Sequence, residues 1–200
     1  MSIELRKGHK INLEKGPSSG LGEVLINLNW NQTTPKKGFF SAFSSPQSID
    51  LDLGCLYELA DGQKFCVQAL GNAFGKLDGP PYIALDGDDR TGSSQGGENL
   101  RINGRMVAKV KRILVYTFIY EGVAKWKDAD AVVRINCPGS QEIVVRMEEY
   151  SSSDKMCAIA MLENSNNETF SVEKIVRFFP DHAQMDKAYG WGMNWVEGKK

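Results

Sequence analysis

The chain has 200 residues, of which 42% are apolar and 24% are charged, and its formal net charge is −1. These values are typical of a soluble globular protein of one domain or two small ones, and the near-zero charge argues against a nucleic-acid or anionic-membrane partner. No apolar run approaches the roughly 20 residues of a membrane-spanning helix. The first ten residues lack the apolar core of a signal peptide, so we expect a cytoplasmic protein without a transmembrane segment.

The first quarter of the chain is expected to form short strands and one long loop. Ile3–Leu13 alternates apolar and polar residues, which predicts two short strands joined by a turn. Residues 23–30 carry apolar side chains at every second position, the pattern of a half-buried strand. Residues 31–48 contain Pro, Gly, Ser and Lys without a period and predict a loop.

Residues 49–59 predict a strand with two different faces. Side chains of a strand alternate between its faces, so every second residue shares a side. One face is apolar, and it holds Leu51, Leu53, Cys55 and Tyr57. The other face holds Asp50, Asp52 and Gly54.

A hairpin is expected next, because Asp61-Gly62 is a strong turn signal and residues 64–70 can return as a strand. With these two residues as the loop, Cys66 lies opposite Tyr57 and diagonal to Cys55, which argues against a disulfide. No two cysteines form a Cys-x-x-Cys pair, so a zinc ribbon or a thioredoxin-type motif is excluded. Each cysteine lies in an apolar, strand-like run, and we expect reduced, buried thiols at Cys55, Cys66, Cys137 and Cys157.

The second half of the chain continues the pattern of short strands. Residues 111–121 are rich in Val, Tyr, Thr, Phe and Ile and predict a strand. Asp181 is a suitable N-cap for a short helix that reaches about Ala188. Two hairpins are expected between these segments, 130–137 with 141–150 and 155–163 with 168–180.

Many short strands separated by turns indicate an all-β fold. We expect an antiparallel β-sandwich of two packed sheets with a short C-terminal helical segment. No composition shift or linker marks a boundary, so the prediction is a single domain over residues 1–200.

The stretch Leu85–Asn103 is dense in oxygen ligands and glycines. Carboxylates and exposed carbonyls are the groups that Ca²⁺ coordinates, so this stretch is a candidate calcium loop. The alternative is a solvated turn, because the same residue types are ordinary turn residues. An EF-hand is excluded, since a loop begun at the first aspartate has Thr91 where Gly is needed and Gly97 where Glu is needed. The candidate ligands are Asp86, Asp88, Asp89, Glu98 and Asn99.

Asp50 and Asp52 form a second acidic segment that could supply ligands to the same ion. Residues two apart on a strand have Cβ atoms roughly 6.5–7 Å apart on one face. Ligands of one Ca²⁺ lie at most about 5 Å apart, and two carboxylates can lean together over that gap. An ion would neutralise their mutual repulsion. The alternative is that both side chains face solvent and bind nothing.

Other chemistries have little support in the sequence. Gly71–Lys76 has the wrong glycine spacing for a phosphate-binding loop. The two histidines, His9 and His182, lie in terminal polar segments, so a histidine-based triad or a multi-histidine metal site is disfavoured. We expect the aromatic residues of the tail to pack against a sheet face and not to form a ligand platform. These residues are Tyr189, Trp191 and Trp195.

The chain resembles the TerD family of tellurium-resistance and stress proteins over nearly its whole length. The most specific part is an Asp-x-Asp strand followed some 35 residues later by Gly-Asp-Asp-Arg-Thr-Gly. Residues 55–59 and 185–192 are closer to the TerA-type branch of the family. The segments that carry the resemblance are 5–13, 24–30, 49–53, 87–92 and 189–192.

The resemblance implies a β-sandwich that binds Ca²⁺ through its two acidic segments. It also implies a role in bacterial resistance to tellurite and other stresses, without an established enzymatic activity. Asp89 stands where the family often has Asn, and Asp86 where it often has Thr or Ser, so Asp86 is included on its chemistry alone. The residues that match acidic family positions are Asp50, Asp52, Asp88 and Glu98.

The chain departs from the family after Gly92. The family loop commonly carries several more carboxylates there, whereas this chain has Ser-Ser-Gln-Gly-Gly over residues 93–97. Affinity for Ca²⁺ rises with the number of charged ligands. We therefore expect weaker calcium binding than in acidic members, or one site in place of two.

The function expected from these observations is that of a non-enzymatic, calcium-binding stress-response protein implicated in tellurium resistance. It would act through binding, with protein partners in a larger assembly. One alternative is an ion-free scaffold that binds a partner through a sheet edge or the loop 31–48. A second is a hydrolase that uses the same carboxylates with Mg²⁺ or Mn²⁺, although no nucleophile–base pair stands out. A third is direct tellurium chemistry on the thiols, which burial of the cysteines would disfavour.

Overall fold

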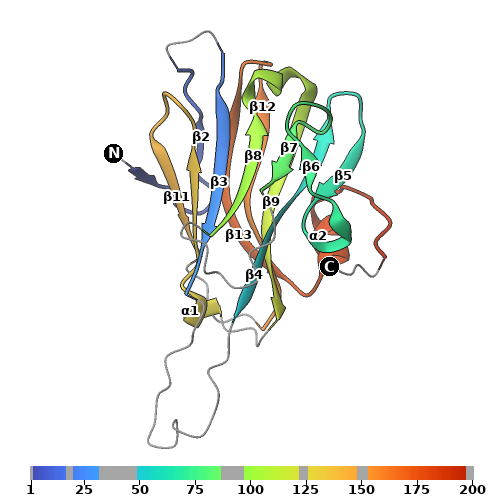
Figure 1. Ribbon diagram of the computed structural model, residues 1–200. Coiled ribbons are helices and arrows are strands. Elements are labelled where there is room, and N and C mark those ends of the chain that lie inside the picture. Colours follow the sequence, from blue (N-terminus) through green and yellow to red (C-terminus); the bar gives the residue numbers. More distant parts are fainter. Residues whose placement is uncertain are drawn as a thin grey trace, which may run out of the picture.

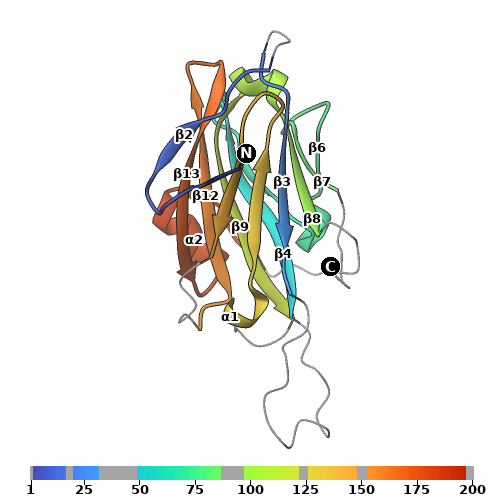
Figure 2. The same cartoon turned by 90° about the vertical axis from the view of Figure 1, so that its left-hand side faces the viewer.

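Two β-sheets packed face to face build the protein, as the computed structural model shows for residues 2–16, 20–31, 49–86, 97–121, 126–147 and 153–196 (Figures 1 and 2). Within these residues one sheet has seven strands and the other has six. The predicted sandwich is therefore confirmed, with one exception to its antiparallel pairing. The exception is β1, which pairs in parallel with β11.

In each sheet the spatial order of the strands differs from their order in the sequence. The seven-stranded sheet runs β1 (Ser2–Glu4), β11 (Glu142–Arg146), β10 (Val132–Asn136), β3 (Glu23–Asn29), β8 (Glu98–Asn103), β7 (Ile83–Leu85) and β6 (Gly75–Lys76). The six-stranded sheet runs β2 (Lys10–Asn12), β13 (Thr169–Phe179), β12 (Met156–Ser165), β9 (Val110–Glu121), β4 (Asp50–Leu59) and β5 (Lys64–Val67). The two short N-terminal strands thus belong to different sheets. The remaining elements are the helices α1 (Trp126–Ala129) and α2 (His182–Tyr189) and the 3₁₀ turns Leu70–Asn72 and Gly104–Lys109.

The core between the sheets follows from the alternation seen in the sequence. The predicted apolar face of β4 is buried there, with Leu51, Leu53 and Cys55 inaccessible to solvent. The long strands β4, β9, β12 and β13 lie side by side and pair over most of their length. None of the helices in the described part of the chain has the length and apolar character needed to cross a membrane.

The predicted register of the β4–β5 hairpin is wrong by one residue. Cys66 lies opposite Leu56, and Tyr57 lies opposite Phe65. The reason is a loop of three residues, Ala60–Gly62, closed by a 2.8 Å hydrogen bond from the Leu59 amide to the Gln63 carbonyl. The shift moves Cys66 to the outer face of the sheet, while Cys55 stays in the core. All four cysteines are free and buried, as expected.

The stretch interpreted as a loop up to Asn103 ends as a strand. Glu98–Asn103 forms β8 and pairs with β3 on one side and β7 on the other. Leu100 and Ile102 point into the core, and so does Glu98. Because the first inward-facing residue of the strand is acidic, its alternation of apolar and polar residues is not evident in the sequence. Residues 87–96 and 32–48 lie outside the described part of the chain, so the loop predicted over 31–48 is not tested.

The C-terminal segment covers the outer face of the six-stranded sheet (Figures 1 and 2). Helix α2 begins after Asp181, whose carboxylate caps the helix by accepting a 2.8 Å hydrogen bond from the backbone N–H of Gln184. The helix ends at Gly190, which has the left-handed conformation. The predicted packing of the tail aromatics on a sheet face is confirmed. Tyr189 and Trp195 are half-buried on it, and Trp191 is buried and donates its indole N–H to the Tyr57 carbonyl at 3.0 Å.

The polar sequence around His182 suggests a surface position, but the side chain packs into an aromatic cluster. Its ring packs against the rings of Tyr116, Phe118 and Trp195, with centroids 4.8–5.5 Å apart. Burial in this cluster lowers the pKa of His182 to about 4, so the imidazole is neutral at neutral pH.

A buried carboxylate on β4 also holds the tail. Glu58 accepts hydrogen bonds from Lys111 at 2.7 Å and from Arg112 at 2.6 Å. Arg112 in turn donates to the Tyr189 carbonyl, and its guanidinium lies 3.8 Å over the ring of Trp191. Burial alone would raise the pKa of Glu58, but the two cations outweigh it and hold the pKa below its ordinary value.

Replacing Gly54 on β4 should destabilise the protein. A Cβ at this position would lie 2.7–2.9 Å from the ring of Tyr116, which packs over it on the outer face. We expect Gly54→Ala to lower the free energy of unfolding by about 1–3 kcal/mol, the usual cost of overpacking. Gly79→Ala is the control, because its nearest neighbours are flexible atoms of the Lys76 side chain. Urea unfolding that gave equal stability for both variants would contradict the close packing.

The ion pairs of Glu58 predict a dependence of stability on pH. A carboxylate whose pKa is lowered by folding stabilises the protein above its unfolded pKa, and this contribution is lost as the pH falls through the folded pKa. Glu58→Gln should cost about 1–3 kcal/mol at pH 7. The difference from wild type should shrink as the pH falls below 4.5, the ordinary value. Glu163→Gln, in an exposed pair with Lys10, is the control and should change little. A pH-independent difference would contradict this assignment.

Candidate metal centre

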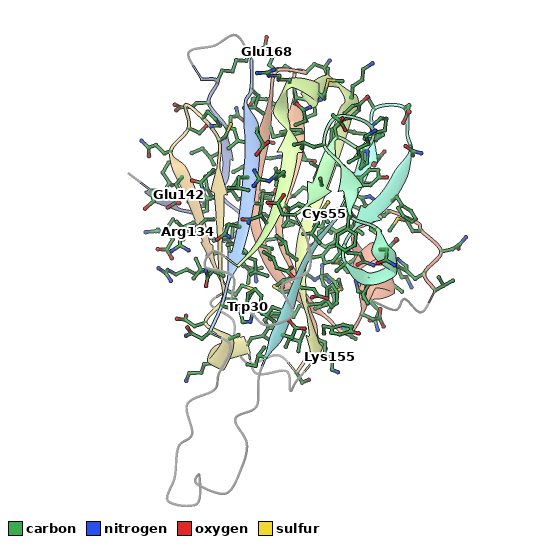
Figure 3. The ribbon with its side chains drawn as sticks, viewed as in Figure 1. Trp30, Cys55, Arg134, Glu142, Lys155 and Glu168 are labelled. Atoms are coloured by element: carbon green, nitrogen blue, oxygen red, sulfur yellow. The ribbon has the colours of Figure 1, made fainter. Side chains whose placement is uncertain are left out.

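The start of β4, which carries the two aspartates, is held by a hydrogen bond from a residue next to the other sheet. Trp30 follows β3 and donates its indole N–H to the Ile49 carbonyl at 2.9 Å, directly before Asp50 (Figure 3). Asp50 is half-buried, and Asp52 is 0% exposed. The alternative in which both aspartates face solvent is therefore wrong for Asp52. A carboxylate this deeply buried requires compensation by hydrogen bonds or an opposite charge.

Glu98 joins the second sheet to this strand. Its side chain is only 2% exposed and points between the sheets from the first position of β8. Its carboxylate accepts a 2.6 Å hydrogen bond from the backbone N–H of Leu53, the residue after Asp52. Strand β5 pairs with β4 only over Cys55–Glu58. The Glu98 carboxylate thus takes the place of a strand partner at the acidic end of β4.

Gly97 sets the entry into β8. Its φ is +68°, a conformation that favours glycine. A Cβ there would also collide with the carbonyl oxygen of Leu28 on β3. The glycine therefore allows the chain to pass close to β3 and to turn Glu98 inward at once.

Two of the predicted ligands are directed elsewhere. Asn99 lies on the face of β8 opposite to Glu98, and its side-chain oxygen accepts a 3.0 Å hydrogen bond from Asn27. The carboxylate of Asp86 accepts two hydrogen bonds from Arg101, at 2.6 and 2.8 Å. Arg101 also donates to Glu23 at 2.6 Å, and these hydrogen bonds raise its pKa.

The structure therefore brings one predicted ligand to the strand of two others, but it does not assemble the predicted set. Glu98 reaches the strand that carries Asp50 and Asp52, while Asp88 and Asp89 lie outside the described residues. Within the described ranges, no group of three His, Cys, Asp or Glu side chains is close enough to hold a metal ion. Carboxylates are ligands of the type that a hard cation prefers, and those of Asp52 and Glu98 are buried.

Sequence reasoning misses the residues that position this site. The alternation assigns Trp30 to a half-buried face, but its donor role depends on a carbonyl in the other sheet. From the sequence, Gly97 is indistinguishable from the other glycines of the loop. Its close approach to Leu28 in the structure explains why a glycine is required directly before Glu98. The Gly-Gly-Glu sequence at the start of a strand is the one local signal for this arrangement.

Removing the Glu98 carboxylate should loosen the acidic end of β4. With the protein in a metal chelator, we expect Glu98→Ala to speed hydrogen exchange of the Leu53 amide and to cost about 1–3 kcal/mol of stability. Asn99→Ala, on the opposite face, should leave the Leu53 amide protected. Unchanged exchange at Leu53 in Glu98→Ala would show that this hydrogen bond does not hold the strand.

Comparisons with known proteins agree with this fold. The TerD domain family model matches residues 1–163. A tellurium resistance protein TerA from an Alcaligenes species is 44% identical over 91% of this chain, but the chain spans only 54% of that protein. A stress response protein SCP2 from Bacillus subtilis is 23% identical over 82% of this chain and 79% of its own length.

Solved structures share the fold at low sequence identity. A homologue of the telluride resistance protein TerD from Streptomyces coelicolor matches with a TM-score of 0.60 at 20% identity, covering 84% of this chain and 95% of that one. A protein of unknown function matches with a TM-score of 0.61 at 13% identity, covering 88% and 99%.

Proposed function

Because the chain belongs to the TerD family of tellurium-resistance and stress-response proteins, we propose that it is a non-enzymatic, calcium-binding member that acts through binding or assembly. The calcium ion would tie the Asp-x-Asp strand to the acidic segment before β8. Its protein partners would meet the surface that this tie orders. The reduced, buried cysteines are compatible with a cytoplasmic location.

The observation that carries the proposal is the contact between Glu98 and β4. The carboxylate lies at the backbone N–H of Leu53, directly after the fully buried Asp52. Buried carboxylates of like charge repel one another, and a divalent cation relieves this repulsion. Strand β8 follows residues 87–96 directly, and the remaining acidic candidates belong to that segment.

The ligands we propose are divided between two roles. Asp50, Asp52 and Glu98 would coordinate the ion only together with Asp88 and Asp89, because the described carboxylates by themselves form no group close enough to hold it. Asp86 and Asn99 would instead fix the strand ends through their hydrogen bonds. With no carboxylate in residues 93–97, the affinity would lie below that of more acidic relatives.

Direct chemistry on the thiols is less well supported. Burial raises the pKa of the Cys55, Cys66 and Cys137 thiols. The thiolate is the reactive form of cysteine, so this shift disfavours attack on a tellurium compound at neutral pH.

Calorimetric titration with Ca²⁺ tests the proposal. A ligand that binds only the folded state stabilises it, by about 2.7 kcal/mol at a hundredfold excess over its dissociation constant. We expect saturable heat and a thermal midpoint several degrees higher in millimolar Ca²⁺, and a smaller rise with Mg²⁺. The double variant Asp50→Asn with Asp52→Asn should lose both effects.

The matched control is Asp78→Asn, which removes an exposed carboxylate and should bind Ca²⁺ like wild type. Asp78 follows Leu77, which contacts Asn103 at the end of β8 opposite to Glu98. The absence of both heat and a midpoint shift in wild type at millimolar Ca²⁺ would refute calcium binding. Retention of both in the double variant would place any bound ion elsewhere.

A further inference from the structure

A cavity of about 180 Å³ lies beside the C-terminal segment. We call it the tail cavity. It is bounded by β5, by the turn that follows it and by residues 193–196. Its walls are mostly apolar, and they include Phe65, Leu70, Met193 and Trp195.

The walls of the tail cavity are held in place by hydrogen bonds. The buried carboxylate of Asp186 accepts from the amides of Gly192 and Met193 at 2.7 and 3.0 Å and from the Trp195 indole at 3.0 Å. On the opposite wall, the backbone N–H of Gln68 donates to the Ala73 carbonyl at 2.9 Å and closes the turn. The cavity is therefore formed before any ligand enters, which lowers the cost of binding.

One polar side chain in the cavity has an unused donor. Gln68 is only 7% exposed, and its side-chain oxygen accepts from the Tyr116 hydroxyl at 2.6 Å and from His182 Nε2 at 3.1 Å. Since that oxygen can only accept, the neutral His182 carries its proton on Nε2. The side-chain nitrogen of Gln68, Nε2, donates no hydrogen bond to any described residue. Two partners thus orient the amide, and its N–H groups are left for a ligand.

The lining carries no charge at neutral pH. Its one ionisable group within the described residues is the Cys66 thiol, whose pKa is raised to about 11 by burial. Large apolar side chains flank the opening, with Phe65 56% and Val196 87% exposed. An anion or a cation would lose its hydration here without gaining a counter-charge.

We propose that the tail cavity binds a neutral, single-ring organic molecule that presents a hydrogen-bond acceptor to the Gln68 amide nitrogen. The ring would lie between the apolar walls formed by Phe65 and Trp195. The volume suits this size, since apolar cavities of about 150 Å³ bind benzene.

Acetophenone is the test ligand, because it combines one ring with one carbonyl acceptor. Its binding can be followed by the ¹³C-methyl signal of Met193, with the Met161 signal as a reference outside the cavity. We expect a saturable shift of Met193 alone. Benzoate and benzylammonium, of similar size but charged, should bind at least about tenfold more weakly.

Gln68→Glu is the deciding variant. It keeps an oxygen for Tyr116 and His182 but replaces the free donor by a second acceptor with a negative charge. Acetophenone binding should fall at least about tenfold, and benzylammonium should become the preferred ligand. Gln63→Glu makes the same change at an exposed turn position and should leave both affinities as in wild type. Thermal unfolding of each variant verifies that it is folded.

Three results would overturn the proposal. One is the lack of a saturable Met193 shift in wild type at millimolar acetophenone. Another is equal affinity for acetophenone in wild type and a folded Gln68→Glu variant, which would leave the amide donor without a role. The third is a preference of wild type for benzoate, which would mean that the site selects an anion.

Discussion

The hydrogen bond from the Leu53 amide to the Glu98 carboxylate is the interaction on which the acidic end of the sandwich depends. A buried carboxylate that accepts no hydrogen bond would be costly, and so would a strand amide without an acceptor. The contact pairs the strand amide with one oxygen of the carboxylate and joins the two sheets. It places Glu98 beside the strand of Asp50 and Asp52 although 45 residues separate it from Leu53 in the chain. The candidate metal centre is thus a product of sheet packing.

Buried carboxylates also hold distant parts of the chain at the outer face of the six-stranded sheet. Glu58 holds Arg112, which in turn holds the end of α2, and Asp186 holds the backbone of the segment after it. Asp186 binds a segment outside the strands directly, and Glu58 acts on the tail through Arg112 of the neighbouring strand β9. Buried polar groups that are satisfied specify one arrangement more sharply than apolar contacts do, because few geometries meet their requirements. The tail cavity owes its fixed walls to this requirement.

Local pattern is sufficient for much of the fold and insufficient wherever position depends on distant residues. The alternation in β3 and β4 predicts strands, because a half-covered sheet needs an apolar face. Strand β9 is predicted from its content of β-branched and aromatic residues. The predicted β4–β5 register is wrong, since Asp61-Gly62 does not reveal that Ala60 joins the loop. His182 is misplaced because its partners come from β9 and from the end of the chain. Strand β8 is missed because an inward-pointing Glu98 interrupts its apolar face.

The sequence by itself determined the class of the fold, the reduced cysteines and the acidic composition of the candidate site. These properties follow from residue type and from a period of two, which are local. Only the tertiary structure decided that Asp52 is buried, and that Glu98 and Asn99 point in opposite directions with different partners. A period of two assigns residues to faces, but it does not state what covers each face. That depends on the packing of strands from distant parts of the chain.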